Sequence, residues 1–258
     1  MSVIRVVAII PARMASSRFP GKPLLKIRGL PMVEHVRRRA LMSGEFTEVA
    51  VATCDREIAS EVERSGGRVI MTSPNHVSAS DRVAEATKHL VCTHVVNVQG
   101  DEILVLPADL ARMVRAITAE PEVPAWNATG KIEHLKELND PSVVKCVVSR
   151  SNRVLFCSRD FSMLPLREGL FEPVRKILGI LAYSSSFLDK YIALQRTPLE
   201  IAESIDQSRI IEHDVTLRGV EFSKGYLGIN EPREVELVEK HLDQDPSQKV
   251  IVDQVLRT

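Results

Sequence analysis

The sequence predicts an α/β fold, with an open, mostly parallel sheet that has helices on both faces and with a small β-rich insertion. The first half of the chain alternates short apolar segments with segments that repeat apolar residues at helical spacing, a pattern typical of successive β-α units. A stretch at about 125–183 is rich in β-forming residues and interrupts this alternation. We expect one domain over residues 1–258, a length that suits a single large α/β domain.

Four segments of the first half are predicted strands. The first of them is a nearly continuous apolar run, as expected for a parallel strand that is covered on both faces. They span residues 3–10, 48–53, 68–72 and 94–99.

The predicted helices between these strands begin at residues that favour the cap or the first turn of a helix. These residues are Pro31, Asp55, Ser80 and Pro107. The alternation of strands and helices is what predicts the parallel sheet.

The insertion has its own pattern. Residues 143–149 and 153–158 flank a tight turn at Ser151-Asn152 and are predicted to form a hairpin, and residues 176–183 form a further predicted strand. Trp126, at the beginning of the insertion, is expected to pack in the core. Such an insertion commonly supplies an acceptor site or a dimer surface.

Composition excludes several classes of function. Lys plus Arg equals Asp plus Glu at 34 each, so no net charge attracts nucleic acid or an anionic membrane. No window approaches the roughly 20 apolar residues of a membrane span, and the N-terminal apolar run is too short for a signal peptide. The four cysteines are scattered, as in proteins of a reducing compartment. We therefore expect a cytoplasmic protein without membrane insertion.

Ligands of open α/β sheets bind beyond the carboxyl ends of the strands. This rule points to four loops of the chain. They span residues 11–23, 54–55, 73–82 and 100–106.

The first of these loops, PARMASSRFPGKPL, combines three cations with small residues. Arg13, Arg18 and Lys22 can offset the charge of a triphosphate, and small residues such as Ser16 let backbone N–H groups approach phosphate oxygens. It is not a Walker A loop, because Lys22 precedes Pro23 instead of Ser or Thr. The alternative is a solvated basic loop, but its place directly after the first buried strand favours phosphate binding.

The fourth predicted strand ends in Gln99-Gly100-Asp101-Glu102. A carboxylate at this place, facing a cationic loop, suits Mg²⁺ that bridges phosphate oxygens. The alternative is a turn that uses Gly and Asp for their backbone preferences alone.

Five segments resemble the motifs of one family, in its order and spacing: PARMASSRFPGKPL, VATCDREIA, VIMTSPNHVSASDRVAEA, VVNVQGDE and NDPSVVKCVV. On these motifs the chain is similar to the 3-deoxy-manno-octulosonate (Kdo) cytidylyltransferases, also called CMP-Kdo synthetases. The resemblance is dense from residue 4 to about 160 and looser to about 240. It implies that CTP and an acidic sugar are the substrates, that pyrophosphate leaves with the help of Mg²⁺, and that the protein is a homodimer.

The resemblance also implies roles for single residues. Arg13, Lys22 and Asp101 are the expected catalytic residues, with Arg13 and Lys22 on the triphosphate and Asp101 on Mg²⁺. Together with the composition of the first loop, it predicts a nucleotide site made of Pro11, Ala12, Arg13, Ser16, Arg18, Lys22, Ser73, Arg82 and Gln99.

The acceptor residues follow from looser matches. FCSRD places Arg159 at the sugar, where its guanidinium can hold a carboxylate. LEIAESIDQ adds Glu203 and Gln207, and ILGILAY adds Tyr183. For the LEIAESIDQ segment, a solvated helix face is the alternative.

The chain departs from the family pattern in several places. Ile103 stands where the family has proline, and Ser-Ala-Ser-Asp-Arg at 78–82 replaces Ser-Gly-Thr-Asp-Arg. Ile177 and Leu181 replace a histidine and a tyrosine. Asn230 stands at the second position that the family uses for Mg²⁺, normally an aspartate. An amide can ligate Mg²⁺ but brings no charge, so we expect weaker metal binding.

These departures leave several functions open. The acceptor is Kdo or, alternatively, another acid: a modified Kdo, a nonulosonic acid or a phosphonate. A second alternative is a nucleotide-binding homologue without turnover. A third, a nucleotidyltransferase for sugar phosphates, is disfavoured because the glycine-rich GxGTR signature is absent.

Overall fold

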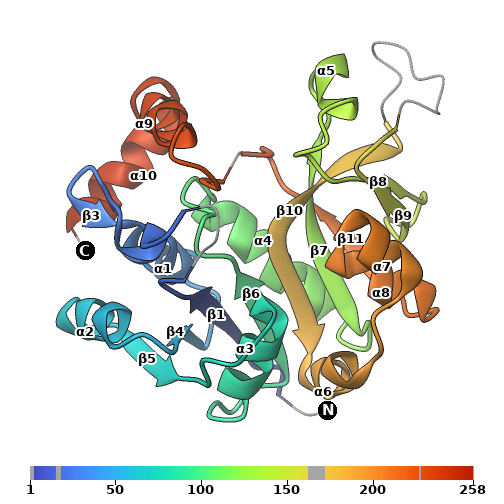
Figure 1. Ribbon diagram of the computed structural model, residues 1–258, viewed down its shortest axis with the longest axis horizontal. Coiled ribbons are helices and arrows are strands. Elements are labelled where there is room, and N and C mark those ends of the chain that lie inside the picture. Colours follow the sequence, from blue (N-terminus) through green and yellow to red (C-terminus); the bar gives the residue numbers. More distant parts are fainter. Residues whose placement is uncertain (1–2, 16–18, 162–171, 227, 258) are drawn as a thin grey trace. The chain divides into compact units, whose positions relative to one another are not determined.

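The computed structural model describes residues 3–15, 19–161, 172–226 and 228–257 (Figure 1). The chain divides into two compact units. The first consists of Met1–Arg115 and Tyr226–Thr258, and the second of Ala116–Gly225. The second unit contains the whole of the predicted β-rich insertion.

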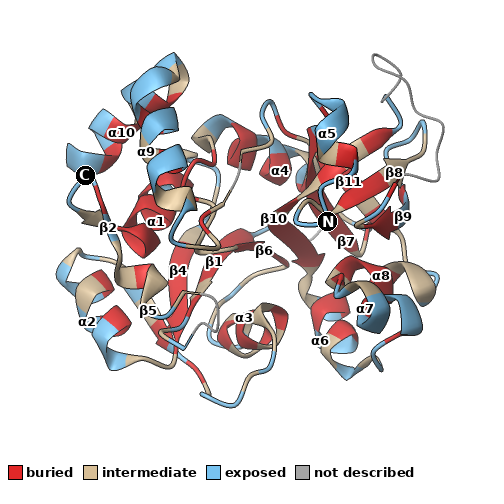
Figure 2. Cartoon of the chain, turned by 45° about the horizontal axis from the view of Figure 1, so that its top comes forward, coloured by how far each residue is buried: buried red, intermediate tan, exposed pale blue. Residues whose placement is uncertain are grey.

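The first unit is built on a sheet whose described strands are all parallel. Their order is β6 (His94–Val98), β1 (Val6–Ala12), β4 (Glu48–Thr53) and β5 (Arg68–Met71). β1, β4 and β6 are buried along nearly their whole length (Figure 2), as predicted for strands that are covered on both faces.

Three helices connect these strands. They are α1 (Met32–Met42), α2 (Arg56–Arg64) and α3 (Ala79–Thr87). α1 contacts β1 and β4, α2 contacts β4 and β5, and α3 contacts β1, β4 and β6. Because crossovers between parallel strands are right-handed, α1 and α2 cover one face of this sheet and α3 covers the other. The predicted α/β class is confirmed.

Two predicted helix caps differ from the structure, one in its hydrogen bond and the other in its position. Asp55 is at the N-cap of α2, but its side chain makes no capping bond there; Oδ2 of Asp55 instead accepts a 2.7 Å hydrogen bond from the backbone N–H of Met14. The cap of α3 is Ser78 and not Ser80 as predicted. Ser78 and Asp81 each accept a hydrogen bond from the other's backbone N–H, a reciprocal box that fixes the first turn.

The remaining elements of the first unit lie outside this sheet. They are η1 (Lys22–Leu24), β2 (Lys26–Ile27), β3 (Leu30–Pro31), α9 (Glu234–Gln244), α10 (Pro246–Arg257) and α4 (Pro107–Ala119), which crosses the boundary between the units. Of these elements, η1, β3 and α10 contact α1. An apolar cluster joins Ile103 and Leu104 to Ile229 and to Leu242 of α9. The C-terminal segment is thereby packed against the chain that follows β6.

The second unit contains a mixed sheet. β10 (Val174–Ser184) pairs antiparallel with β7 (Ala125–Lys131) and β8 (Lys145–Val148), β9 (Val154–Ser158) pairs antiparallel with β8, and β11 (Leu217–Glu221) lies parallel to β7. The hairpin predicted around Ser151-Asn152 is confirmed, and Asn152 has the left-handed φ of 59° that its turn requires.

The helices of the second unit are short. They are α5 (Leu135–Leu138), α6 (Ser185–Ala193), α7 (Pro198–Glu203) and α8 (Asp206–Glu212). Trp126 is fully buried, as predicted. Cys146 and Cys157 are buried, and none of the four cysteines forms a disulfide. In the part of the chain that the structure describes, no helix has the length and apolarity to cross a bilayer.

Candidate functional site

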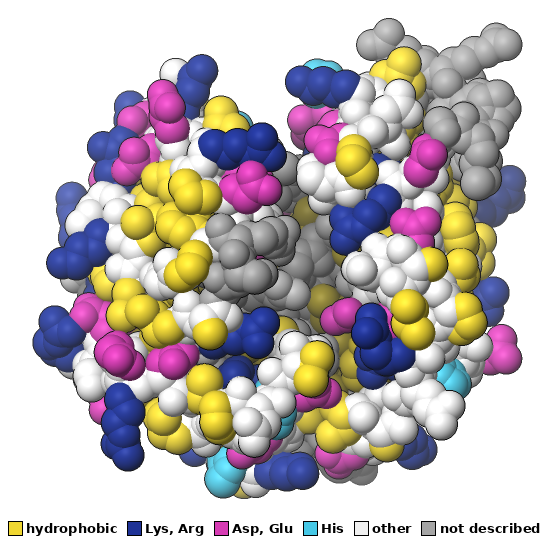
Figure 3. All heavy atoms as spheres, in the orientation of Figure 1, with side chains coloured by type: hydrophobic (Ala, Val, Ile, Leu, Met, Phe, Trp, Pro, Cys, Tyr) yellow, Lys and Arg dark blue, Asp and Glu magenta, His cyan; other side chains and the backbone are white. Residues whose placement is uncertain are grey.

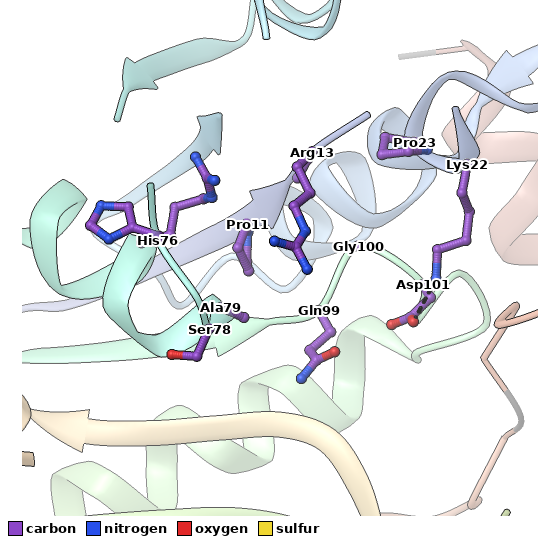
Figure 4. A pocket seen from close by; sticks show the side chains of 12 residues that line it. Pro11, Arg13, Lys22, Pro23, His76, Ser78, Ala79, Gln99, Gly100 and Asp101 are labelled. Carbon is purple, nitrogen blue, oxygen red and sulfur yellow. Dashed lines mark hydrogen bonds and ion pairs between the residues drawn. The ribbon is translucent and has the colours of Figure 1, made fainter. Parts of the chain in front are cut away.

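A pocket lies at the carboxyl ends of β1 and β6 in the first unit, with a cavity volume of about 210 Å³ (Figure 4). Its walls come from three of the predicted ligand loops, 11–23, 73–82 and 100–106, and from the end of β6. Seven predicted residues line it: Pro11, Ala12, Arg13, Lys22, Arg82, Gln99 and Asp101. Ser73 belongs to the same loop as Arg82 but is not part of the lining, and Ser16 and Arg18 lie outside the described residues.

The first loop is held at two places. Gly21, with a φ of 76°, donates its N–H to the carbonyl oxygen of Met14 at 3.0 Å. The N–H of Met14 donates to Asp55 at the start of α2. The first bond folds the loop back on itself and the second attaches it to the start of α2, so that Lys22 of η1 returns to the edge of the sheet where β1 ends.

Arg13 brings an open positive charge to this edge. Its side chain is exposed, and within the described residues it has no ion pair. Figure 4 shows its guanidinium pointing toward the side of the pocket formed by Gln99 and Gly100. On the face seen in Figure 3, cationic and anionic side chains are interspersed, so the positive charge of the pocket is a local feature.

Lys22 and Asp101 form a half-buried ion pair. Nζ of Lys22 lies 2.8 Å from Oδ2 of Asp101 and 2.8 Å from the carbonyl oxygen of Ile229, and the two charged side chains are only 15% and 16% exposed. The pair links the loop after β1 to the loop after β6, as expected for residues that follow neighbouring parallel strands.

Gly100 allows the ends of β1 and β6 to come this close. A Cβ atom at this position would lie 3.3 Å from the carbonyl oxygen of Pro11. That distance is shorter than ordinary van der Waals contact, so a larger residue would push the two loops apart. Gly100 therefore sets the spacing between Arg13 on one wall and Asp101 on the other.

The third wall is the N-terminus of α3, where Ser78 and Ala79 line the pocket. The first turn of a helix carries a partial positive charge that attracts anionic or carbonyl oxygens. Arg82, one turn further, is buried and donates to the hydroxyl of Thr72. This wall therefore adds fixed dipoles to the cations of the first loop.

His76 lines the pocket but is absent from the predicted site. Its Nε2 is hydrogen-bonded to the carboxylate of Glu85 on α3, and the same oxygen of Glu85 accepts the N–H of Ser73 at 2.9 Å. The hydrogen bond from His76 holds the pKa of Glu85 below its usual value. The one sequence signal for His76 is its place between the predicted residues Ser73 and Arg82.

The residues near Asp101 fit a magnesium ion that arrives with a nucleotide. The N–H of Ile229 donates to the carbonyl oxygen of Asp101 at 3.3 Å, which places Asn230 in the segment beside that carboxylate. Carboxylate, carbonyl and amide oxygens are donors that Mg²⁺ prefers, and Mg²⁺ is often held by one carboxylate together with substrate phosphates. Within the described residues, no group of three or more His, Cys, Asp or Glu side chains could hold a metal ion by itself.

The predicted acceptor residues lie in the second unit, where Arg159 and Glu203 are close together. The carboxylate of Glu203 accepts the N–H of Arg159 at 3.0 Å and the hydroxyl of Ser158 at 3.1 Å. The guanidinium of Arg159 donates to the carbonyl oxygens of Glu203 and Pro141, each at 2.8 Å. These partners orient Arg159 without neutralising its charge.

Tyr183 and Gln207 have other neighbours. Tyr183 is fully buried, and its ring centroid lies 5.5 Å from that of Tyr191. Gln207 is buried and donates to the amide oxygen of Asn127 at 2.7 Å. Both side chains therefore contribute to packing within the second unit, and the acceptor roles expected for them stay predictions.

Comparisons with known proteins show the family to which the chain belongs. A family model described as "Cytidylyltransferase" matches residues 7–217. The chain is 37% identical to a 3-deoxy-manno-octulosonate cytidylyltransferase of Geobacter metallireducens, over 93% of this chain and 99% of the relative. It is 36% identical to an 8-amino-3,8-dideoxy-manno-octulosonate cytidylyltransferase of Shewanella sp. strain W3-18-1, over 93% of this chain and 99% of the relative.

Solved structures give the same result. The structure of a CMP:2-keto-3-deoxy-manno-octonic acid synthetase complexed with CTP superposes with a TM-score of 0.86 at 34% identity, covering 93% of this chain and 99% of that chain. The family model covers the loops that form the pocket, because its match spans residues 7–217. The chain therefore belongs to the cytidylyltransferase family and, within it, to the 3-deoxy-manno-octulosonate cytidylyltransferases.

Proposed function

We propose that the protein transfers CMP from CTP to Kdo or a closely related acidic sugar and releases pyrophosphate. The observation that carries this proposal is the pocket in which Arg13, Lys22 and Asp101 converge at the ends of β1 and β6. The sequence around them is that of a chain 37% identical to a Kdo cytidylyltransferase. A site with two cations and one carboxylate at a parallel-sheet edge suits a nucleoside triphosphate.

The reaction forms one P–O bond and breaks another. The anomeric hydroxyl of the sugar attacks the α-phosphorus of CTP and gives up its proton to the solvent, and pyrophosphate leaves in line. The protein contributes by positioning the reactants and by neutralising the charge that develops on the phosphates. Arg13, Lys22 and the N-terminus of α3 provide positive charge and dipoles for this task. Magnesium, when held by Asp101 near Ile229 and Asn230, supplies further charge neutralisation at the phosphates.

Arg159 is the residue that we propose for the carboxylate of the acceptor. Its guanidinium is oriented by carbonyl oxygens and has no carboxylate partner among the described residues. An arginine held in this way can bind an incoming carboxylate through two parallel hydrogen bonds.

The identity of the acceptor is decided by a direct comparison of acids, because two relatives that are named for different acceptors are 37% and 36% identical to this chain. Kdo, 8-amino-3,8-dideoxy-manno-octulosonate and a nonulosonic acid are each incubated with CTP and Mg²⁺, and the CMP conjugates are quantified by mass spectrometry. We expect the highest kcat/KM for Kdo or its 8-amino analogue. A higher kcat/KM for the nonulosonic acid would contradict the proposed acceptor class.

The alternative hypothesis is a nucleotide-binding homologue without turnover. The observation that favours it is Asn230, which stands in place of an aspartate. This hypothesis predicts a thermal shift on addition of CTP but no CMP conjugate with any acid.

Membership of this family also supports a cytoplasmic homodimer. Light scattering on the purified protein tests the oligomeric state.

A further inference from the structure

The ammonium group of Lys22 occupies a small cradle of oxygen atoms. Oδ2 of Asp101 and the carbonyl oxygen of Ile229 both lie 2.8 Å from Nζ of Lys22. These oxygens come from two segments far apart in the sequence, the loop after β6 and the loop before α9. Hard oxygen donors of this kind also bind divalent cations, so Lys22 stands where a metal ion would find its protein ligands.

The local charges leave the cradle neutral when Lys22 is in place. Lys22 contributes one positive charge and Asp101 one negative charge, and Asn230 contributes none. The neighbouring carboxylates have other partners: Glu234 accepts the backbone N–H groups of Asn230 and Glu231, and Glu231 pairs with Arg233 at 2.8 Å. A divalent cation without a nucleotide therefore finds little net attraction here.

The cradle is also fixed in shape. A Cβ atom at Gly228 would lie 3.1 Å from the carbonyl oxygen of Asp101, so the backbone before Ile229 rests directly on Asp101. Ile229 itself is fully buried in the apolar cluster with Ile103 and Leu104. Its carbonyl oxygen is therefore held in position whether or not Lys22 is bound to it.

We propose that Lys22 is a tethered cation that closes a metal cradle, formed by the Asp101 carboxylate and the Ile229 carbonyl, until a nucleotide binds. The phosphates of the nucleotide draw the ammonium group away, and the two freed oxygens become ligands of the metal that accompanies the phosphates. This inference rests on the proposed function for the identity of the nucleotide as CTP. Its consequence is positive coupling: metal binds weakly alone and tightly together with the nucleotide.

The test measures Mn²⁺ binding to the nucleotide-free full chain by electron paramagnetic resonance, with the wild type compared to Lys22→Met. We expect the variant to bind Mn²⁺ about tenfold more tightly, within the usual range of coupling between sites. Asn230→Asp is expected to increase affinity as well, because it adds a negative charge beside the cradle. Lys26→Met removes an exposed lysine of β2 and serves as the matched control, for which no change is expected.

A double variant locates the site. Lys22→Met combined with Asp101→Asn should lose the gain in Mn²⁺ affinity. Circular dichroism confirms that each variant is folded, and Lys22→Gln replaces Lys22→Met if the latter is unfolded. The proposal is overturned if wild type and Lys22→Met bind Mn²⁺ equally, or if the gain persists without the Asp101 carboxylate.

The Mn²⁺ affinity of the nucleotide-free protein is independent of turnover, since neither CTP nor an acceptor is present in the titration. A protein that failed to form any CMP conjugate would contradict the proposed function, while a gain of Mn²⁺ affinity in Lys22→Met would still support the closed cradle. CTP binding in EDTA, measured by calorimetry, reports separately on the nucleotide site.

Discussion

The carboxylate of Glu85 on α3 binds both the imidazole of His76 and the backbone N–H of Ser73. One side chain thereby ties the loop after β5 to α3 and holds His76 at the wall of the pocket. The hydrogen bonds that it accepts explain how a loop without regular structure keeps a defined position beside the nucleotide site.

Replacing Glu85 with glutamine is therefore expected to loosen this wall. We predict a rise of about three- to tenfold in the KM for CTP with a smaller change in kcat, since one or two hydrogen bonds of ordinary strength are weakened. Steady-state kinetics checks this, with Glu57→Gln, an exposed residue of α2, as the control. An unchanged KM in Glu85→Gln would show that the loop needs no such support.

Arg13 is expected to act on the nucleotide and not on stability. Its side chain is exposed and has no ion pair among the described residues, so Arg13→Ala should leave the Tm nearly unchanged. Loss of a charge-assisted hydrogen bond to phosphate predicts a fall of about 10- to 100-fold in kcat/KM for CTP. Arg56→Ala, on the exposed face of α2, should lower neither quantity; equal kinetic effects of the two variants would contradict a specific role for Arg13.

Two glycines next to the pocket are predicted to have different effects. Gly100→Ala places a Cβ 3.3 Å from the oxygen of Pro11, and Gly228→Ala places one 3.1 Å from the oxygen of Asp101. We expect Gly100→Ala to weaken CTP binding severalfold even in EDTA, and Gly228→Ala to raise mainly the Mg²⁺ concentration needed for half-maximal activity. Calorimetry and a magnesium titration distinguish the two, and the reverse pattern would contradict the assigned walls.

The burial of His35 predicts that the free energy of unfolding depends on pH. It is fully buried in α1, its Nε2 bonds to the carbonyl of Ile27 at 2.8 Å, and burial lowers its pKa from 6.5 to about 4. Between these values the unfolded chain binds a proton that the folded protein does not, so stability is lost as pH falls from 6.5 to about 4. The loss is about 3 kcal/mol at most.

Urea unfolding of the wild type and of His35→Gln across this pH range isolates the contribution of His35. The variant should be less stable at neutral pH, and the difference between the two proteins should shrink as the pH falls. A difference that does not depend on pH would mean that His35 does not titrate in this way.

Much of the fold could be predicted because the relevant signals are local. β1 is a continuous apolar run, the strands that follow it alternate with helical segments, and the hairpin at Asn152 has its turn signal in the sequence. The convergence of Lys22 and Asp101 also follows from a simple rule, since the loops that contain them follow neighbouring parallel strands.

Other features depend on contacts that no local pattern records. The pairing of His76 with Glu85 requires the register of a loop against α3, and the bond from Asp55 to Met14 replaces the capping bond that its position predicted. The segment at Ile229 returns to Asp101 from more than a hundred residues away. For this reason its carbonyl oxygen was absent from the predicted metal site.

The most direct test of the central claim is pyrophosphate release from CTP and Mg²⁺, measured with and without Kdo. We predict release that requires the acid and that is lost in both Lys22→Met and Asp101→Asn. The absence of release with Kdo and with its 8-amino analogue, in a protein whose Tm rises on addition of CTP, would contradict the proposed transfer of CMP.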